Sequence, residues 1–130
     1  MILVDTHVVV WVAGDPQKLS SKARAAIDQE LRAGQALAIS CMTLFELAHL
    51  LARGRFRTTL SIDAYLMEIE SRFVVLPLSR QIAARTVELP NHYPNDPMDR
   101  IIGATAIVEG LPLVTADAQI QQSKAVKTIW

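Results

Sequence analysis

Cysteine is almost missing from this chain, because Cys41 is the only one among 130 residues. A disulfide framework and a cysteine-based zinc site are therefore excluded, and Cys41 itself is expected to be a small buried residue. No apolar run approaches the roughly 20 residues that a transmembrane helix requires. The apolar stretch after Asp5 also lacks the basic flank of a signal peptide. We therefore expect a cytoplasmic protein with no membrane segment.

The chain also lacks a surplus of charge and has few aromatic residues. Basic and acidic residues number 13 each, so the net charge is zero, which argues against a generally basic nucleic-acid binder. Aromatic residues make up 5% of the chain, too few for the stacking surface of RNA-recognition folds. The densest basic run is RGRFR, with Arg53, Arg55 and Arg57. It is either a solvated loop or a contact for RNA or a partner.

Apolar residues, in contrast, are abundant, at 51% of the chain. The length indicates a single domain over residues 1–130. Short apolar segments predict strands at 2–5, 36–40, 73–76 and 113–115, with a possible fifth at 126–129. Between them, helical patterns cover a brief turn at 7–13 and longer stretches starting at Ser20 or Ser21 and at residues 42, 61, 79 and 96. This alternation predicts an α/β fold with a parallel sheet buried on both faces.

Acidic residues stand near the ends of several predicted strands. Asp5 closes the first strand, Glu46 lies in the helix after the second, Asp96 and Asp99 begin the helix before the fourth, and Asp117 follows the fourth. Sites in open parallel sheets form beyond the carboxyl ends of strands. Crowded carboxylates repel, and a hard cation such as Mg²⁺ or Mn²⁺ removes that repulsion. Such an ion polarises a phosphodiester and lowers the pKa of a bound water.

Each acid also has a structural alternative. Asp5 and Asp96 are candidate helix caps, Asp99 favours the helix dipole, and Asp117 suits the start of a short turn. Glu46 belongs to a polar stripe with Thr43 and Arg53 that is solvated in the alternative interpretation. The other candidates are mostly given structural roles: His7, His49 and His92 as structural or surface residues, and Trp11 as a core or interface residue. Arg100 either binds a phosphate or, in the favoured interpretation, pairs with a neighbouring carboxylate.

Asp96 and Asp99 are expected to differ in role. With Pro97 as the first helical residue, Asp96 is the N-cap and its side chain accepts hydrogen bonds from the backbone. Asp99 lies at the third helical position with a free carboxylate, and Gly103 keeps that face of the helix uncrowded. Asp99 is therefore the predicted metal ligand, with Asp96 as its organiser.

Three segments and their order resemble the PIN-domain ribonucleases, above all the VapC-like toxins of toxin–antitoxin pairs. The segments are ILVDTHVVVWV, SCMTLFELAHLLARGR and NDPMDRIIGATAIVEGLPLVTADAQI, within which DPMDRIIGATA followed by LVTAD is the most specific. One departure is TADAQI, where the family more often has a basic or larger residue after Thr115. By this resemblance the acidic metal-binding positions are Asp5, Glu46, Asp99 and Asp117, and the accessory positions are Asp96 and Thr115.

The resemblance implies a three-layer α/β/α PIN-like fold whose central, mostly parallel sheet has four to five strands. It also implies an endoribonuclease that depends on Mg²⁺ or Mn²⁺, forms homodimers and is inhibited by a small antitoxin with a DNA-binding domain. The main alternative is a degenerate PIN-like or receiver-like scaffold that binds a partner without catalysis. A phosphatase that forms an aspartyl-phosphate is disfavoured, because such enzymes need a second Asp two residues after the first, where this chain has His7.

Overall fold

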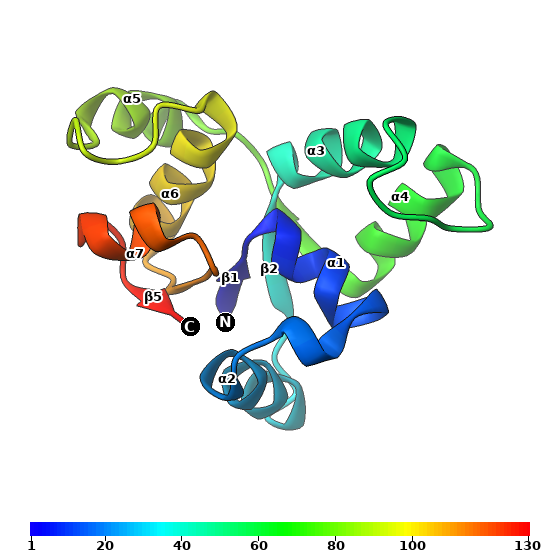
Figure 1. Ribbon diagram of the computed structural model, residues 1–130. Coiled ribbons are helices and arrows are strands. Elements are labelled where there is room, and N and C mark those ends of the chain that lie inside the picture. Colours follow the sequence, from blue (N-terminus) through cyan, green and yellow to red (C-terminus); the bar gives the residue numbers. More distant parts are fainter.

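The structure is a computed structural model that describes all 130 residues. Two α-helices separate each strand from the next up to the fourth strand, and one α-helix separates the fourth strand from the fifth (Figure 1). The five strands are β1 Ile2–Val4, β2 Leu37–Ser40, β3 Phe73–Leu76, β4 Leu113–Val114 and β5 Thr128–Ile129. The helices are α1 Thr6–Gly14, α2 Ser21–Arg32, α3 Cys41–Ala52, α4 Ile62–Arg72, α5 Arg80–Glu88, α6 Pro97–Glu109 and α7 Ala118–Ser123, with a 3₁₀ turn at Pro16–Lys18.

The strands form one sheet in the order β3-β2-β1-β4-β5, and every neighbouring pair is parallel. The chain adds β2 and β3 on one side of β1 and then crosses to add β4 and β5 on the other. The direction of winding therefore reverses between β1 and β4. In open parallel sheets the crevice at such a reversal, beyond the carboxyl ends of the strands, is where ligands bind.

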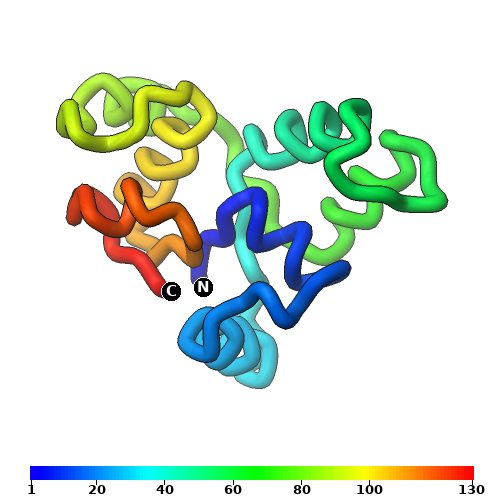
Figure 2. Tube along the Cα trace, viewed as in Figure 1, coloured from blue at the N-terminus to red at the C-terminus, as the bar shows by residue number.

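Two apolar clusters cover the two faces of this sheet. Alternate strand residues point to opposite faces, so Ile2 and Val4 belong to one cluster while Leu3 belongs to the other. The first cluster includes residues of α1, α2, α3 and α4, and the second includes residues of α6 and α7. Figure 2 shows the same division: the blue-to-green part of the chain winds on one side and the yellow-to-red part on the other. The predicted three-layer α/β/α fold is confirmed.

The structure corrects the sequence prediction at two elements. Residues 6–14 form a full helix, α1, rather than a brief turn, because the Asp5 side chain caps its first turn. A short helix, α7, follows Asp117 where only a turn was considered. The parallel sheet is confirmed, with every pair of neighbouring strands parallel, and so is the possible fifth strand, which is β5. Helix α6 ends before Gly110, which adopts φ 66°, the left-handed conformation typical of glycine after a helix. No helix has the length and apolar character to cross a bilayer.

Candidate active site

Asp5 lies at the junction of β1 and α1, with 4% of its surface exposed. Its Oδ1 accepts a hydrogen bond from the backbone N–H of Thr6 at 2.8 Å, and its Oδ2 accepts one from the Thr115 hydroxyl at 2.7 Å. Because Val4 pairs with Val114, the next residues, Asp5 and Thr115, leave neighbouring strands side by side. The helix-cap interpretation of Asp5 is confirmed, but it accounts for only one of the two carboxylate oxygens.

Glu46 reaches the same place from α3. The Thr6 hydroxyl donates to Glu46 Oε1 at 2.6 Å and lies 3.2 Å from the hydroxyl of Thr43. Burial raises the pKa of Glu46; the Thr6 hydrogen bond lowers it, and the charges of Asp5 and Asp96 raise it again. The solvated-stripe interpretation is therefore wrong for Glu46, which is half-buried, and for Thr43, which is fully buried.

Asp96 and Asp99 share the first turn of α6 but are held differently. Asp96 is the N-cap, and its Oδ1 accepts from the backbone N–H groups of Met98 at 2.9 Å and Asp99 at 3.3 Å. The hydrogen bonds of Asp99 are made by its main chain, at its N–H and its carbonyl. The pKa of the Asp99 carboxyl is raised to about 7, first by burial and then by the charges of four neighbouring carboxylates: Asp5, Asp96, Glu46 and Asp117.

Asp117 and Thr115 come from the segment after β4. Thr115 is fully buried, and its hydroxyl accepts from the Asp117 backbone N–H at 3.1 Å while donating to Asp5. Asp117 is the N-cap of α7, with Oδ1 accepting from the Ile120 N–H at 3.0 Å. Thr115 therefore links the acid at the end of β1 to the one after β4.

The structure brings the predicted site residues to one edge of the sheet. The charges of acids from the end of β1, α3, the start of α6 and the start of α7 all raise the pKa of the Asp99 carboxyl, so each of them lies within electrostatic range of Asp99. As the side chains stand, no group of three or more His, Cys, Asp or Glu residues has a geometry that holds a metal ion. Two of the acids are turned toward hydroxyl donors instead, Asp5 toward Thr115 and Glu46 toward Thr6.

Three residues near these acids were missed or undervalued by the sequence reasoning. Thr6 is the hydrogen-bond donor to both Asp5 and Glu46, and its position directly after Asp5 was the available signal. His7 was expected to be structural, and its Nε2 accepts from the backbone N–H of Ala116 at 2.9 Å, in the loop that carries Asp117. Tyr93 gave no sequence signal. It is fully buried, and its hydroxyl donates to the Asp99 carbonyl at 2.9 Å.

Other polar candidates lie outside this network. Arg100 was expected to pair with a carboxylate, which is wrong: its Nη1 donates to the Thr86 carbonyl at 3.0 Å. His49 and His92 were expected to be structural or surface residues. His49 Nδ1 lies 2.9 Å from the Phe45 carbonyl oxygen, and His92 Nε2 lies 2.9 Å from the Ser123 carbonyl oxygen. Cys41 is half-buried at the start of α3 rather than fully buried.

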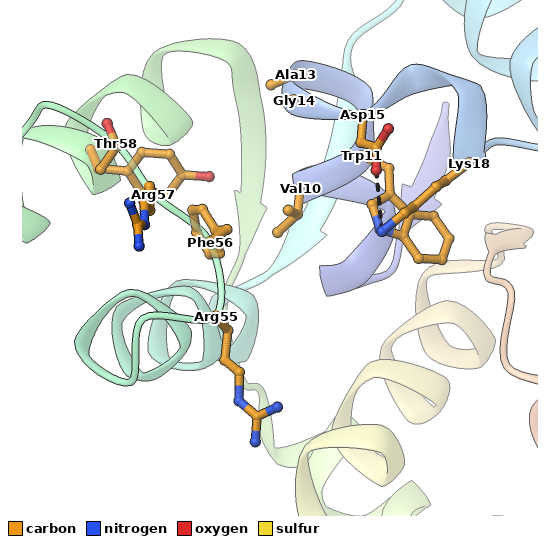
Figure 3. Close-up of a pocket in the computed structure, with 11 residues that line it drawn as sticks. Val10, Trp11, Ala13, Gly14, Asp15, Lys18, Arg55, Phe56, Arg57 and Thr58 are labelled. Atoms are coloured by element: carbon orange, nitrogen blue, oxygen red, sulfur yellow. Dashed lines mark ion pairs between the residues drawn. The ribbon is translucent and has the colours of Figure 1, made fainter.

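The basic run borders a separate hollow of about 520 Å³ between α1 and the loop after α3. Figure 3 shows Arg57 on the loop side and, across from it, Trp11 with Lys18, which is ion-paired to Asp15 at 3.1 Å. Trp11 is half-buried and packs on Trp130 with ring centroids 5.8 Å apart, in agreement with its predicted packing role. Arg53, Arg55 and Arg57 are all exposed to solvent.

Comparisons with known proteins agree with this fold and these motifs. The family model for the PIN domain matches residues 2–126. Ribonuclease VapC22 of Mycobacterium tuberculosis is 33% identical over 131 residues, covering 99% of this chain and 98% of that protein. Similar solved structures include VapBC2 from Rickettsia felis bound to a DNA fragment from its promoter, with 18% identity, a TM-score of 0.72 and coverage of 98% and 97% of the two chains. A toxin–antitoxin complex from Klebsiella pneumoniae is 26% identical, with a TM-score of 0.61 and coverage of 90% and 87%.

Proposed function

The chain belongs to the PIN domain family, and from this premise we propose that it is an endoribonuclease and the toxin of a toxin–antitoxin pair. The observation that carries the proposal is the gathering of acids from separate segments beyond β1 and β4, where the winding of the sheet reverses. The relative named as a ribonuclease spans the same length, which supports the same activity here.

The donor set fits a divalent cation by its chemistry and charge. Carboxylate oxygens are the preferred ligands of Mg²⁺ and Mn²⁺, and the pKa of Asp99 is raised by its burial and by the negative charges of the four acids around it. Carboxylates gathered at one place repel one another, and a divalent cation would remove that repulsion. We propose that Asp5, Glu46, Asp99 and Asp117 hold the ion. When bound, it supplies Lewis-acid polarisation of a phosphodiester and a water of lowered pKa.

The chain's own residues then have distinct roles in the proposal. Asp96 organises the first turn of α6 by accepting from two backbone N–H groups, which orients Asp99. Thr115 orients Asp5 and the Asp117 main chain through one hydroxyl. Thr6 orients Asp5 through its backbone N–H and Glu46 through its hydroxyl. These bonds hold acids from distant segments in place before substrate arrives, which reduces the reorganisation needed at the reacting phosphate.

The proposal also covers the partners and the extent of the domain. We propose RNA as the substrate, a homodimer as the working form, and a small antitoxin with a DNA-binding domain as the inhibitor. The structural relatives include toxin–antitoxin complexes, one of them bound to promoter DNA, which supports the antitoxin. Residues 1–130 then form a single nuclease domain. Overexpression is expected to arrest bacterial growth, and co-expression of the adjacent small gene is expected to relieve it.

The test is cleavage of total RNA by the purified protein, with the products mapped at their ends. Cleavage is expected with Mn²⁺ or Mg²⁺, and it should stop when a chelator is added. Glu46→Gln should lose activity, whereas Asp28→Asn, which removes one exposed carboxylate from α2, should retain it. If the wild type leaves RNA intact while metal and pH are varied, the nuclease proposal is wrong and the partner-binding scaffold is favoured.

A further inference from the structure

Tyr93 is the largest fully buried side chain in the protein, yet it comes from the loop between α5 and α6. Its backbone N–H donates to the Pro90 carbonyl at 2.9 Å, which closes a turn that directs the ring inward. The ring belongs to the apolar cluster formed with α6 and α7. A loop tyrosine placed so deeply needs a partner for its hydroxyl, and it has one in the Asp99 carbonyl at 2.9 Å.

Gly103 provides the space for this ring. A Cβ at position 103 would overlap the Tyr93 hydroxyl and lie 2.6 Å from its Cζ atom. Glycine is a poor residue for a helix interior, and Gly103 lies in the middle of α6 with ordinary helical geometry. The expectation that Gly103 leaves this face uncrowded is therefore wrong, because the face is filled by Tyr93.

Gly103 lies one helical turn after Asp99, so the contact between Tyr93 and Gly103 is close to the main chain of Asp99. Residues four apart lie one above the other on a helix, and the backbone carbonyl of the first accepts from the N–H of the second. The Tyr93 ring thus lies on the turn that begins at Asp99, and its hydroxyl adds a second donor to the Asp99 carbonyl. With Asp96 accepting from the Asp99 N–H, both polar groups of the Asp99 peptide are held by side chains.

We propose that Tyr93 is a positioning residue for Asp99, holding the first turn of α6 so that the Asp99 carboxylate faces the other acids. First turns of helices fray readily, because their N–H groups lack partners within the helix. The Asp99 carboxylate itself has no protein donor to orient it, so its position depends on its main chain. This inference rests on the proposed function, in which Asp99 binds the metal ion.

The first arm of the test is Tyr93→Phe, which keeps the ring over Gly103 and removes only the hydroxyl. We expect the melting temperature to fall by roughly 4 °C or less. We expect kcat for RNA cleavage to fall by about tenfold or more with KM little changed, since small misplacements of a catalytic group cost much activity. Mn²⁺ is expected to raise the melting temperature of the wild type because it binds only the folded protein, and this rise should be smaller in Tyr93→Phe. The matched control is Tyr65→Phe, because Tyr65 is half-buried on α4 against Phe56 and outside the acid cluster. It should leave kcat and the Mn²⁺ response unchanged.

The second arm tests the packing through a double-mutant cycle between positions 93 and 103. Gly103→Ala should lower the melting temperature and kcat strongly in the wild-type background, because the new methyl group collides with the ring. In the Tyr93→Leu background, which lacks the colliding atoms, the same substitution should have little effect on melting. If Gly103→Ala proves insoluble, Tyr93→Phe decides the matter alone.

The outcomes separate this inference from the proposed function. If the wild type binds Mn²⁺ and cleaves RNA but Tyr93→Phe matches it in kcat and in the Mn²⁺ response, Tyr93 only fills the core and the inference is overturned. If the wild type shows neither metal binding nor cleavage, the proposed function fails and this inference fails with it. A kcat loss and a smaller Mn²⁺ response in Tyr93→Phe, beside an unaffected Tyr65→Phe, support the inference.

Discussion

Asp5 and Asp99 belong to the same acidic cluster, yet the protein holds their carboxylates in opposite ways. On the strand side, both oxygens of Asp5 accept hydrogen bonds, from Thr6 and Thr115, and Glu46 accepts from Thr6 as well. On the helix side, Asp99 is held only by its main chain, and the pKa of its carboxyl is raised to about 7.

The difference indicates a division of labour within the site. On the strand side the protein supplies the hydrogen-bond donors itself: the Thr115 hydroxyl donates to Asp5, and the Thr6 hydroxyl donates to Glu46. On the helix side no protein group donates to the Asp99 carboxylate, so only a proton or a bound cation can neutralise its charge. In the proposed enzyme, strand-side residues would therefore contribute to both stability and activity, whereas Asp99 would contribute to activity at the expense of stability.

The largest expected effect is on cleavage by Asp5→Asn. Asparagine keeps the cap, since its side-chain oxygen still accepts from Thr6 N–H and its amide can donate to the Thr115 hydroxyl. The fold should survive while a ligand charge is lost, which we expect to reduce kcat by roughly a thousandfold. Kinetics on a defined RNA and a circular dichroism melt measure both. Cleavage at the wild-type rate by Asp5→Asn would remove Asp5 from the metal site.

The next expected effect is on the stability of the metal-free protein, which should depend on pH through Asp99. The pKa of Asp99 rises from 3.8 to about 7 on folding, so the folded protein binds this proton more tightly than the unfolded chain does. Metal-free stability should therefore fall as the pH rises from about 4 to about 7, and remain low above it. The full shift corresponds to about 4 kcal/mol, which solvent screening reduces to about 2 kcal/mol for this partly exposed group.

Asp99→Asn removes that cost and should raise the metal-free melting temperature at pH 8 by roughly 6 °C, while abolishing cleavage. It should also flatten the dependence of melting on pH between about 4 and 7. Asp5→Ala, in contrast, should lower the melting temperature at the same pH, because it removes the cap of α1. A metal-free Asp99→Asn protein that melts below the wild type would contradict the assigned difference between the two sides.

A smaller effect is expected at Thr6, on the strand side. Thr6→Val keeps the shape but removes the donor to Glu46, and it should destabilise the protein by about 1–2 kcal/mol. Because that hydrogen bond lowers the pKa of Glu46, its loss should raise this pKa further. Thr6→Ser, which keeps the hydroxyl, is the matched control. Denaturant unfolding compares the three proteins, and equal stability of the valine and serine variants would exclude a structural role for the bond.

The smallest expected effect concerns Asp96, the N-cap of α6. Asp96→Ala removes the acceptor for two N–H groups of α6 and should cost about 1 kcal/mol, with some loss of activity. Asp96→Asn caps about as well and should keep stability and much of the activity. An inactive Asp96→Asn beside an active Asp99→Asn would reverse the roles given to these two acids.

These two sides also differ in how far the sequence predicts them. Asp96, followed by Pro97 at the first helical position, is a local signal, and the structure confirms both the cap and the helix start. The strand ends at Asp5 and Thr115 follow from apolar segments and the tendency of parallel strands to share an edge. The family resemblance is confirmed by the comparisons, while the assignment of metal ligands stays a prediction.

Contacts between distant segments were beyond prediction. The bond from Thr6 to Glu46 joins residues 40 apart in the chain, and it depends on how α1 packs against α3. The Tyr93 contact depends on a loop turn and on the space above Gly103. The helix α7 has only six residues, too few for a periodic pattern, so its start at Asp117 was seen only as a possible turn.

The central proposal is that the acids gathered beyond β1 and β4 bind a divalent cation. Among them, Asp99 is the acid whose carboxylate has no protein donor, so its charge most needs the cation. Calorimetric titration of Mn²⁺ into the metal-free protein at pH 8 tests this most directly, with Asp99→Asn and the surface variant Asp28→Asn titrated in parallel. We expect saturable binding in the wild type and in Asp28→Asn, and its loss in Asp99→Asn. Binding of equal affinity and stoichiometry in Asp99→Asn, or none in the wild type, would contradict it.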